Sequence, residues 1–368
     1  MKYVITGGGS GGHIYPAIAI GQTIRSTEPE SEILFVSNKG GMAKDIYEKY
    51  GFDVKEVTSR WLDRSNVFDM TKTGFATLKG IRESKKIIKD FKPDVIIGTG
   101  GFVCFPFIYA THAMKNRPKI FIQEQNAFPG ITNKLLSKYA TKVFMGFQKA
   151  ADSFKEKDKL IVTGNPVRES FFGRNRSEDK ASLGLKNEFA ILVLGGSIGS
   201  KFINEKSIEL IKKINGTSEY RLICVGGADE GDALRSEIKK AGIELSDNIQ
   251  VLDYIHEMEK YLNAVDLVIG RAGALTLAEI TACGRASIII PCPGVTENHQ
   301  YYNAKELADK GAIIMIEESD FEMERLCEEI EKVRADRQYR MELECRSLEY
   351  GSKNSAQKIY HEIKASVL

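Results

Sequence analysis

A histidine that directly follows the first glycine-rich turn of the chain could act as a base or bind an anion. The turn, Gly7-Gly8-Gly9-Ser10-Gly11-Gly12-His13, comes after the short apolar run 3–6. An imidazole accepts a proton near neutral pH, which suits the removal of a proton from a substrate hydroxyl group. A contact that caps the following helix is the alternative interpretation of His13. The glycines let the backbone turn sharply, and the helix start that follows can bind an anion.

Two polar segments follow other apolar runs in the first half of the chain. Gly98-Thr99-Gly100-Gly101-Phe102 comes after 95–97, and Gln123-Glu124-Gln125-Asn126 comes after 120–122. Open α/β sheets bind their ligands at the carboxyl ends of the strands, where both segments are expected. Burying four consecutive polar side chains costs free energy unless they bind something, so this run is a candidate site. A solvated polar loop is the alternative.

The second half contains similar turns. Gly195-Gly196-Ser197 follows the run 190–194, and a turn at 270–273 precedes a helix start at 274–279. Free N–H groups at such a helix start can hold a diphosphate, and Glu279 could accept hydrogen bonds from two ribose hydroxyls or serve only the helix dipole. The sequence contains no Asp-x-Asp pair for a metal–diphosphate complex. Leaving-group charge would therefore be stabilised by helix N-termini and neutral donors.

Two other nucleotide-binding classes fit the sequence poorly. Gly7-x-Gly9-x-x-Gly12 matches the dinucleotide fingerprint, which also needs an acidic residue at the end of the second strand. That predicted strand ends with Phe35-Val36-Ser37-Asn38-Lys39 and has no carboxylate. No Gly-x-x-x-x-Gly-Lys-Ser/Thr motif is present, which argues against a P-loop NTPase.

The elements that must position these residues alternate between strand and helix. The strands predicted first are 3–6, 33–36, 54–57, 95–97, 120–122 and 142–144. After a break at Thr163-Gly164-Asn165-Pro166 the alternation restarts, with strands 191–194, 221–225, 249–252, 267–269, 287–290 and 312–315. This pattern predicts an α/β protein with two Rossmann-like parallel-sheet domains, 1–163 and 164–344, facing a cleft. We expect helix over 342–368, with its part from about residue 345 packing back on the first domain.

Composition and cysteine usage indicate a globular protein. The chain has 368 residues, of which 42% are hydrophobic and 28% charged. No apolar run reaches the roughly 20 residues that cross a bilayer, and no secretory leader is recognisable. The six cysteines are scattered, and no Cys and His cluster has zinc-site spacing. We interpret them as reduced thiols of a cytoplasmic protein and expect no metal and no cofactor.

The net charge of +2 hides an asymmetry between the two halves. Residues 1–165 carry 25 Lys and Arg against 16 Asp and Glu, a balance of +9, and the remainder carries 27 against 34, a balance of −7. The first half is therefore expected to meet an anionic partner, unless its basic face is merely solvated. Nucleic acid is the weaker choice, because no basic and aromatic recognition motif accompanies the charge.

Taken together, these segments resemble the MurG family, the peptidoglycan N-acetylglucosaminyltransferases with the GT-B fold. The likeness covers nearly the whole chain, and its motifs occur at 7–17, 98–102, 124–126, 129–134, 163–168, 195–197, 271–279 and 298–300. The resemblance implies inverting transfer of GlcNAc from UDP-GlcNAc to the 4-hydroxyl of MurNAc in lipid I. The product would be lipid II for cell wall biogenesis, with roles in cell shape and division. UDP-GlcNAc would be a substrate, with no metal required.

The resemblance also implies site residues. The base would be His13, with Glu124 as the second candidate. On the acceptor side it implies Ser10, Gly11, Gly12 and Asn126. On the donor side it implies Arg168, Ser197, Ile255 (through its backbone), Ala274, Leu275, Thr276, Glu279 and Gln300.

Four positions depart from the family pattern. Gln123 stands where the family commonly has His, Ile198 where it has a polar or basic residue, and Phe102 where it has Tyr, with Cys104 in place of Ser. A glutamine cannot act as a base, so Gln123 is excluded from that role. Two alternatives therefore stay open: a transferase of the same fold with another lipid or small-molecule acceptor, and a catalytically silent scaffold that binds UDP-sugars.

The segment 69–89 has the composition of a membrane-docking helix. Phe75, Leu78 and Ile81 recur at intervals of three among basic residues that include Lys72, Lys79 and Arg82. Each basic residue near an anionic leaflet contributes on the order of 1 kcal/mol to binding. The hypothesis is a peripheral patch on the cytoplasmic face of the cell membrane, where cell-wall and division proteins are further expected partners. The alternative is a helix whose apolar side lies in the core.

Overall fold

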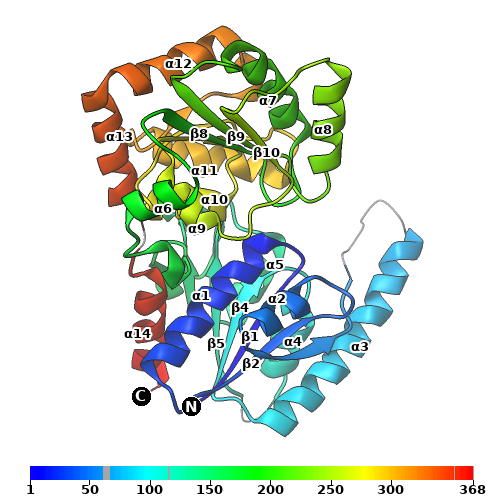
Figure 1. The fold of residues 1–368 in the computed structure, drawn as a ribbon. Coiled ribbons are helices and arrows are strands. Elements are labelled where there is room, and N and C mark those ends of the chain that lie inside the picture. The colour runs from blue at the N-terminus through cyan, green and yellow to red at the C-terminus, as the bar shows by residue number, and fades with distance from the viewer. Residues whose placement is uncertain (61–66, 115–116, 352, 368) are drawn as a thin grey trace. The chain divides into compact units, whose positions relative to one another are not determined.

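The fold was analysed in a computed structural model that describes residues 1–60, 67–114, 117–351 and 353–367. The chain forms two compact units, one comprising Met1–Glu169 and the C-terminal segment from Asn354, the other Ser170–Lys353. Figure 1 shows the elements of each unit.

The first unit contains a seven-stranded sheet in the order β3-β2-β1-β4-β5-β6-β7, with every neighbouring pair parallel. Its strands are β1 (Lys2–Gly7), β2 (Glu32–Asn38), β3 (Asp53–Val57), β4 (Val95–Gly100), β5 (Lys119–Glu124), β6 (Lys142–Met145) and β7 (Leu160–Val162). Its α-helices are α1 (Gly11–Thr27), α2 (Ala43–Lys49), α3 (Val67–Phe91), α4 (Cys104–His112), α5 (Ile131–Leu136) and α14 (Ser355–Val367). Short 3₁₀ turns are η1 (Ser137–Tyr139), η2 (Gln148–Ser153) and η3 (Lys157–Lys159), and η4 (Glu169–Phe171) spans the division between the units.

Helices cover both faces of this sheet, which explains why central strands such as β1 and β4 are buried almost continuously, whereas the edge strand β3 alternates. Successive residues point to opposite faces, so Val4 packs in one core cluster, with α3 and α4, and Ile5 in another, with α1. Ile359 and Ile363 of α14 are fully buried in the second cluster, and Figure 1 shows α14 beside α1. The last helix is therefore part of the core of the first unit.

The second unit contains a six-stranded parallel sheet in the order β10-β9-β8-β11-β12-β13. Its strands are β8 (Phe189–Leu194), β9 (Tyr220–Val225), β10 (Ile249–Leu252), β11 (Leu267–Gly270), β12 (Ala286–Ile289) and β13 (Ile314–Met315). Its helices are α6 (Arg176–Ser182), α7 (Lys201–Ile214), α8 (Gly231–Lys240), α9 (Met258–Ala264), α10 (Ala274–Ala282), α11 (His299–Ala308), α12 (Met323–Ala335) and α13 (Arg337–Glu349), with 3₁₀ turns η5 (Thr296–Asn298) and η6 (Glu318–Asp320).

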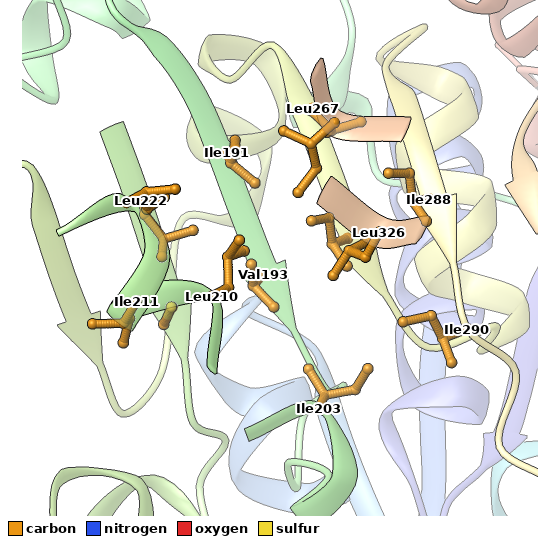
Figure 2. Packing of buried hydrophobic residues seen from close by; sticks show 14 of the residues in the cluster. Ile191, Val193, Ile203, Leu210, Ile211, Leu222, Leu267, Ile288, Ile290 and Leu326 are labelled. Carbon is orange, nitrogen blue, oxygen red and sulfur yellow. The ribbon is translucent and has the colours of Figure 1, made fainter. Parts of the chain in front are cut away.

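One large apolar cluster joins the helices to one face of the second sheet. Figure 2 shows Ile191, Val193 and Leu267 of the strands among the side chains of this cluster. Ile211 of α7 and Leu326 of α12 belong to the same cluster. This core fixes the sheet whose carboxyl ends carry the glycine turns of the second half.

The predicted fold class is confirmed, and two local predictions differ from the structure. Helix over 342–368 is wrong as one element, because α13 ends at Glu349 and α14 starts at Ser355; of that range, Ser352 and Leu368 lie outside the described residues. The units divide at Glu169 and at Lys353, whereas the sequence placed these divisions near 163 and 344. None of the described helices has the length and apolarity to cross a bilayer.

Candidate functional site

His13 lies in the first turn of α1, where segments from three neighbouring strands meet. Its Nδ1 is 3.0 Å from the carbonyl oxygen of Thr99, after β4, and 2.9 Å from Oε1 of Gln125, after β5. Both oxygens can only accept, so Nδ1 carries the proton and the lone pair of the neutral ring is on Nε2. Gly100 has φ of +107°, and a Cβ there would lie 2.7 Å from Nδ1 of His13. A glycine at this position is therefore required for the ring to lie against the loop.

The carboxylate of Glu124 is buried beside this ring site and is surrounded by donors. It accepts hydrogen bonds from the backbone N–H groups of Asn126 at 2.9 Å and Gly130 at 3.1 Å. The side-chain amide of Asn133 donates to it at 2.8 Å, and that of Asn126 at 3.3 Å. Burial raises the pKa of Glu124, and these hydrogen bonds offset only part of the rise. The carboxylate therefore holds together the loop that follows β5.

The start of α1 has the features of an anion site. Ser10 is the N-cap residue, but its side chain makes no capping hydrogen bond, and no acidic residue lies in the first turn. Ser10 is exposed, and Gly11 and Gly12 are partly exposed. The backbone N–H groups of this turn are thus near the surface and close to His13 in the chain.

Arg168 has its described contacts inside the first unit. Its guanidinium donates a hydrogen bond to the hydroxyl of Tyr50 and lies 4.7 Å from the ring centre of Tyr15. The side chain is 7% exposed. The resemblance assigns Arg168 to the donor side. The described contacts instead attach Arg168 to the first unit, one residue before that part of the unit ends at Glu169.

In the second unit, the start of α10 presents backbone donors and one carboxylate. Gly273 is the N-cap, with no side-chain cap and no acidic residue in the first turn. Ala274 and Leu275 have buried apolar side chains, so these two residues can bind a ligand only through their backbone N–H groups. Thr276 and Glu279 are partly exposed and follow Gly273 at intervals of three, which places them on one helix face. This face combines positive helix-end charge with a hydrogen-bond acceptor.

Gln300 of α11 connects the loops after β11 and β12. Its Oε1 accepts from the backbone N–H groups of Ala272 at 3.2 Å and Cys292 at 3.0 Å. Asn303, one turn later, donates to the carbonyl oxygen of Ala272 at 3.2 Å. The peptide that precedes α10 is therefore held on both sides by α11.

The other two predicted donor residues have different surroundings. Ser197 is exposed in the turn after β8, next to Ile198, whose side chain is 60% exposed. Ile255, after β10, is buried. Ser197 shares the carboxyl edge of the sheet with the start of α10, because β8 and β11 are neighbours, whereas β10 is the edge strand.

Arg271 is an organising residue of the second unit that was not among the predicted site residues. Its Nε donates to the hydroxyl of Ser200 at 3.0 Å, and Nη1 is 2.6 Å from a carboxylate oxygen of Glu318. Nη1 also donates to the carbonyl oxygen of Ile290 at 3.1 Å. The buried guanidinium thus joins loops after β8, β11, β12 and β13. In the sequence, the feature that could have identified Arg271 is its position as a basic residue just after an apolar strand.

The basic segment of α3 is divided between surface and core. Phe75 is 76% exposed and Leu78 is 57% exposed, and Lys72, Lys79 and Arg82 are exposed. Ile81 instead lies partly buried against the core cluster of the first unit. The exposed residues, which we call the α3 patch, are Lys72, Phe75, Leu78, Lys79 and Arg82.

Comparisons with known proteins agree with this arrangement along the whole chain. The Glycosyltransferase family 28 N-terminal domain matches residues 3–145, and the Glycosyltransferase family 28 C-terminal domain matches residues 190–363. A protein of Alkaliphilus oremlandii is 39% identical, with 99% of each chain covered. Its name is UDP-N-acetylglucosamine–N-acetylmuramyl-(pentapeptide) pyrophosphoryl-undecaprenol N-acetylglucosamine transferase. The chain belongs to the MurG family.

Two further comparisons support the assignment to the MurG family. A protein of the same name from Thermoanaerobacter is 38% identical and covers 99% of this chain and 100% of its own. The crystal structure of Acinetobacter baumannii MurG matches with a TM-score of 0.73 and 26% identity, over 99% of this chain and 100% of that one. Among the described residues, no group of three or more His, Cys, Asp and Glu side chains could hold a metal ion.

Proposed function

We propose that this chain transfers GlcNAc from UDP-GlcNAc to the 4-hydroxyl of MurNAc in lipid I and so makes lipid II. The observation that carries the proposal is the 39% identity, over 99% of the chain, to a relative named for this transfer. The arrangement around His13 supports it, because a neutral imidazole with its lone pair on Nε2 can accept the proton of a hydroxyl.

The proposed reaction is a single displacement at the anomeric carbon. The acceptor oxygen forms a bond to that carbon while the bond from the carbon to the diphosphate oxygen breaks. UDP leaves with the electron pair, and the hydroxyl proton passes to Nε2 of His13. Attack from the face opposite the leaving group inverts the anomeric configuration.

The start of α10 is proposed to bind the donor. Its uncapped N–H groups would stabilise the negative charge that develops on the diphosphate, and Glu279 would accept hydrogen bonds from the ribose hydroxyls. Ser197, Gln300 and the backbone of Ile255 complete the proposed donor set. Because a helix end and neutral donors would stabilise the leaving-group charge, we propose that the reaction needs no metal ion.

His13 is a better candidate for the base than Glu124. The Glu124 carboxylate already accepts four hydrogen bonds inside the protein and is 1% exposed. A proton transferred to it would weaken those hydrogen bonds and loosen the loop after β5. We therefore assign Glu124 a positioning role, with Asn126 presented by the same loop on the acceptor side.

The α3 patch is proposed to dock on the anionic cytoplasmic face of the cell membrane, where lipid I is held. Phe75 and Leu78 expose apolar area that water solvates poorly, and three cations lie on the same side of the helix. The excess of basic residues in 1–165 supports the same orientation.

Product analysis tests this function. The full chain is incubated with UDP-GlcNAc and a short-chain lipid I analogue, and the product is analysed by mass spectrometry and NMR. We expect one GlcNAc, β-linked to the 4-oxygen of the muramoyl sugar. An α-linkage would contradict the displacement, and equal transfer to acceptors that lack the muramoyl group would contradict the assigned acceptor.

A further inference from the structure

A chain of buried amides extends from His13 toward the end of the first unit. Gln125 is 1% exposed, Gln123 is fully buried and Asn165 is 3% exposed. Gln125 contacts the imidazole directly, and the other two side chains lie behind it. Buried amides of this kind must satisfy their donors and acceptors within the protein.

Main-chain carbonyl groups determine which way each amide faces. Asn165 donates through Nδ2 to the carbonyl oxygen of Gln125 at 2.9 Å, so its Oδ1 faces Gln123. Gln123 donates through Nε2 to that Oδ1 at 3.0 Å and to the carbonyl oxygen of Glu124 at 3.2 Å, so its own Oε1 faces Gln125. Each orientation therefore sets the next one.

The last amide in the series turns an acceptor toward the imidazole. Gln125 donates through Nε2 to Oε1 of Gln123, to the carbonyl oxygen of Gln123 at 3.1 Å and to that of Thr99 at 2.6 Å. Its Oε1 is left facing Nδ1 of His13 at 2.9 Å. If the amide turned over, its oxygen would lie against two carbonyl oxygens, which is unfavourable.

We propose that Gln125 and Gln123 are positioning residues that hold His13 in the Nδ1–H tautomer, with Nε2 directed to the acceptor hydroxyl. Unlike a histidine at position 123, a glutamine presents its donor and acceptor without titrating near neutral pH. The inference rests on the proposed function, because it gives the series of amides a role in proton transfer.

The backbone around the amides is shaped to admit them. A Cβ at Gly146 would lie 2.2 Å from Oδ1 of Asn165, and one at Gly100 would lie 2.7 Å from Nδ1 of His13. Glycine is thus needed at both ends of the series. Nδ1 of His13 contacts Thr99 and Gln125, so substitution of Gln123 tests the series without removing either of these two residues.

The test combines ¹⁵N NMR of histidine-labelled protein with steady-state kinetics. The chain has five histidines, and the His13→Gln variant assigns the signals of His13. In the wild type we expect the Nδ1–H pattern. In Gln125→Leu and Gln123→Leu we expect signal from the Nε2–H tautomer and a fall in kcat of about 10- to 100-fold, with KM for UDP-GlcNAc changed less than about twofold. Gln123→His keeps one hydrogen-bond donor and one acceptor at this position, so its kcat should be much closer to that of the wild type than the kcat of Gln123→Leu.

A matched control removes a structural amide elsewhere. Asn248, before β10, donates to the carbonyl oxygen of Ile214 at 2.8 Å, and Asn248→Leu should lower stability without changing the tautomer or kcat. The inference would be overturned if His13 of the wild type carried its proton on Nε2. It would also be overturned if both leucine variants kept the tautomer and the kcat of the wild type. If Gln125→Leu does not fold, Gln123→Leu decides alone. A wild type without acceptor-dependent turnover but with the Nδ1–H pattern would instead overturn the proposed function and the catalytic role of the amides.

Discussion

The ring of His13 is held at one nitrogen by two acceptors, and the carboxylate of Glu124 is surrounded by donors. These surroundings give the two residues different capacities, because donation from Nδ1 places the basic lone pair of the neutral imidazole on Nε2. The imidazole is suited to proton transfer and the carboxylate to organising a loop.

Substitution of each residue should separate these roles. His13→Ala should lower kcat by about 10²- to 10⁴-fold and leave UDP-GlcNAc affinity unchanged, because a general base contributes only when the proton moves. Glu124→Gln keeps one acceptor oxygen and should lower stability more than kcat. Initial rates, calorimetric binding and thermal melts measure these effects. A larger kcat loss in Glu124→Gln than in His13→Ala would contradict the assignment.

Glu279 should determine recognition of the ribose. We expect Glu279→Ala to weaken UDP binding about tenfold and to weaken 2′-deoxy-UDP binding less, because the deoxy ligand already lacks one of the hydrogen bonds. Calorimetric titration with both ligands measures the difference. Glu237→Ala, an exposed α8 residue paired with Lys240, is the control. An equal loss for both ligands would assign Glu279 to the helix alone.

Residue types and spacing were enough to propose His13 and Glu279, but not the partners that orient them. Gln125 was visible as part of a polar run, yet its amide orientation depends on carbonyl groups of Thr99 and Gln123 that meet only when the sheet forms. Arg271 was visible as a cation after a strand, but its link to Glu318 joins segments far apart in the chain.

At the scale of elements, α3 and α14 extend the first unit beyond its sheet. α3 exposes Phe75 and Leu78, and α14 buries Ile359 and Ile363 against the core. Twelve of the strands were predicted, most of them from apolar runs, because the central strands of a parallel sheet are buried on both faces. The edge strand β7 has only three residues, none of them buried, so its apolar run was too short to identify as a strand.

The α3 patch should bind anionic vesicles. Phe75→Ser combined with Leu78→Ser is expected to reduce sedimentation with vesicles that contain anionic lipid by about tenfold or more, because apolar insertion and charge act together. Met341→Ser with Leu348→Ser removes two exposed apolar side chains from α13 and should have no effect. Equal binding of the wild type to neutral and anionic vesicles would contradict the electrostatic part.

The contact of Glu28 with α14 should make the first unit sensitive to acid. Burial alone would raise the pKa of Glu28, but hydrogen bonds from the Met1 ammonium group, Tyr3 and Lys364 lower it from 4.5 to about 2. The folded state therefore favours the carboxylate, so its contribution is present above pH 4.5 and is lost as the pH falls toward 2.

Thermal melts between pH 7 and pH 2 measure this contribution. Glu28→Gln should be less stable than the wild type at pH 7 and should lose less stability than the wild type in the acid range. Glu32→Gln, which breaks an exposed pair with Lys2, should change stability at pH 7 by less than about 0.5 kcal/mol. If the stability of the wild type and of Glu28→Gln fell in parallel with decreasing pH, ionised Glu28 would not be the source of the acid sensitivity.

At the scale of the whole molecule, each unit contributes one half of the proposed chemistry. The first carries His13, the loop after β5 and the α3 patch, and the second carries the start of α10 with Gln300. The balance of +9 in residues 1–165 against −7 in the remainder fits a chain in which one half meets an anionic lipid surface. Alternation of strands and helices was sufficient to predict two such units. The boundaries near 169 and 353 depend on packing between distant segments, such as α14 with α1, which local sequence patterns do not encode.

The most direct measurement is UDP release from UDP-GlcNAc by the full chain, with and without a short-chain lipid I analogue, in excess EDTA. We expect release that depends on the acceptor and is unchanged by EDTA. Binding of UDP-GlcNAc without acceptor-dependent release would contradict the transferase activity, and release abolished by EDTA and restored by a divalent metal would contradict its metal independence.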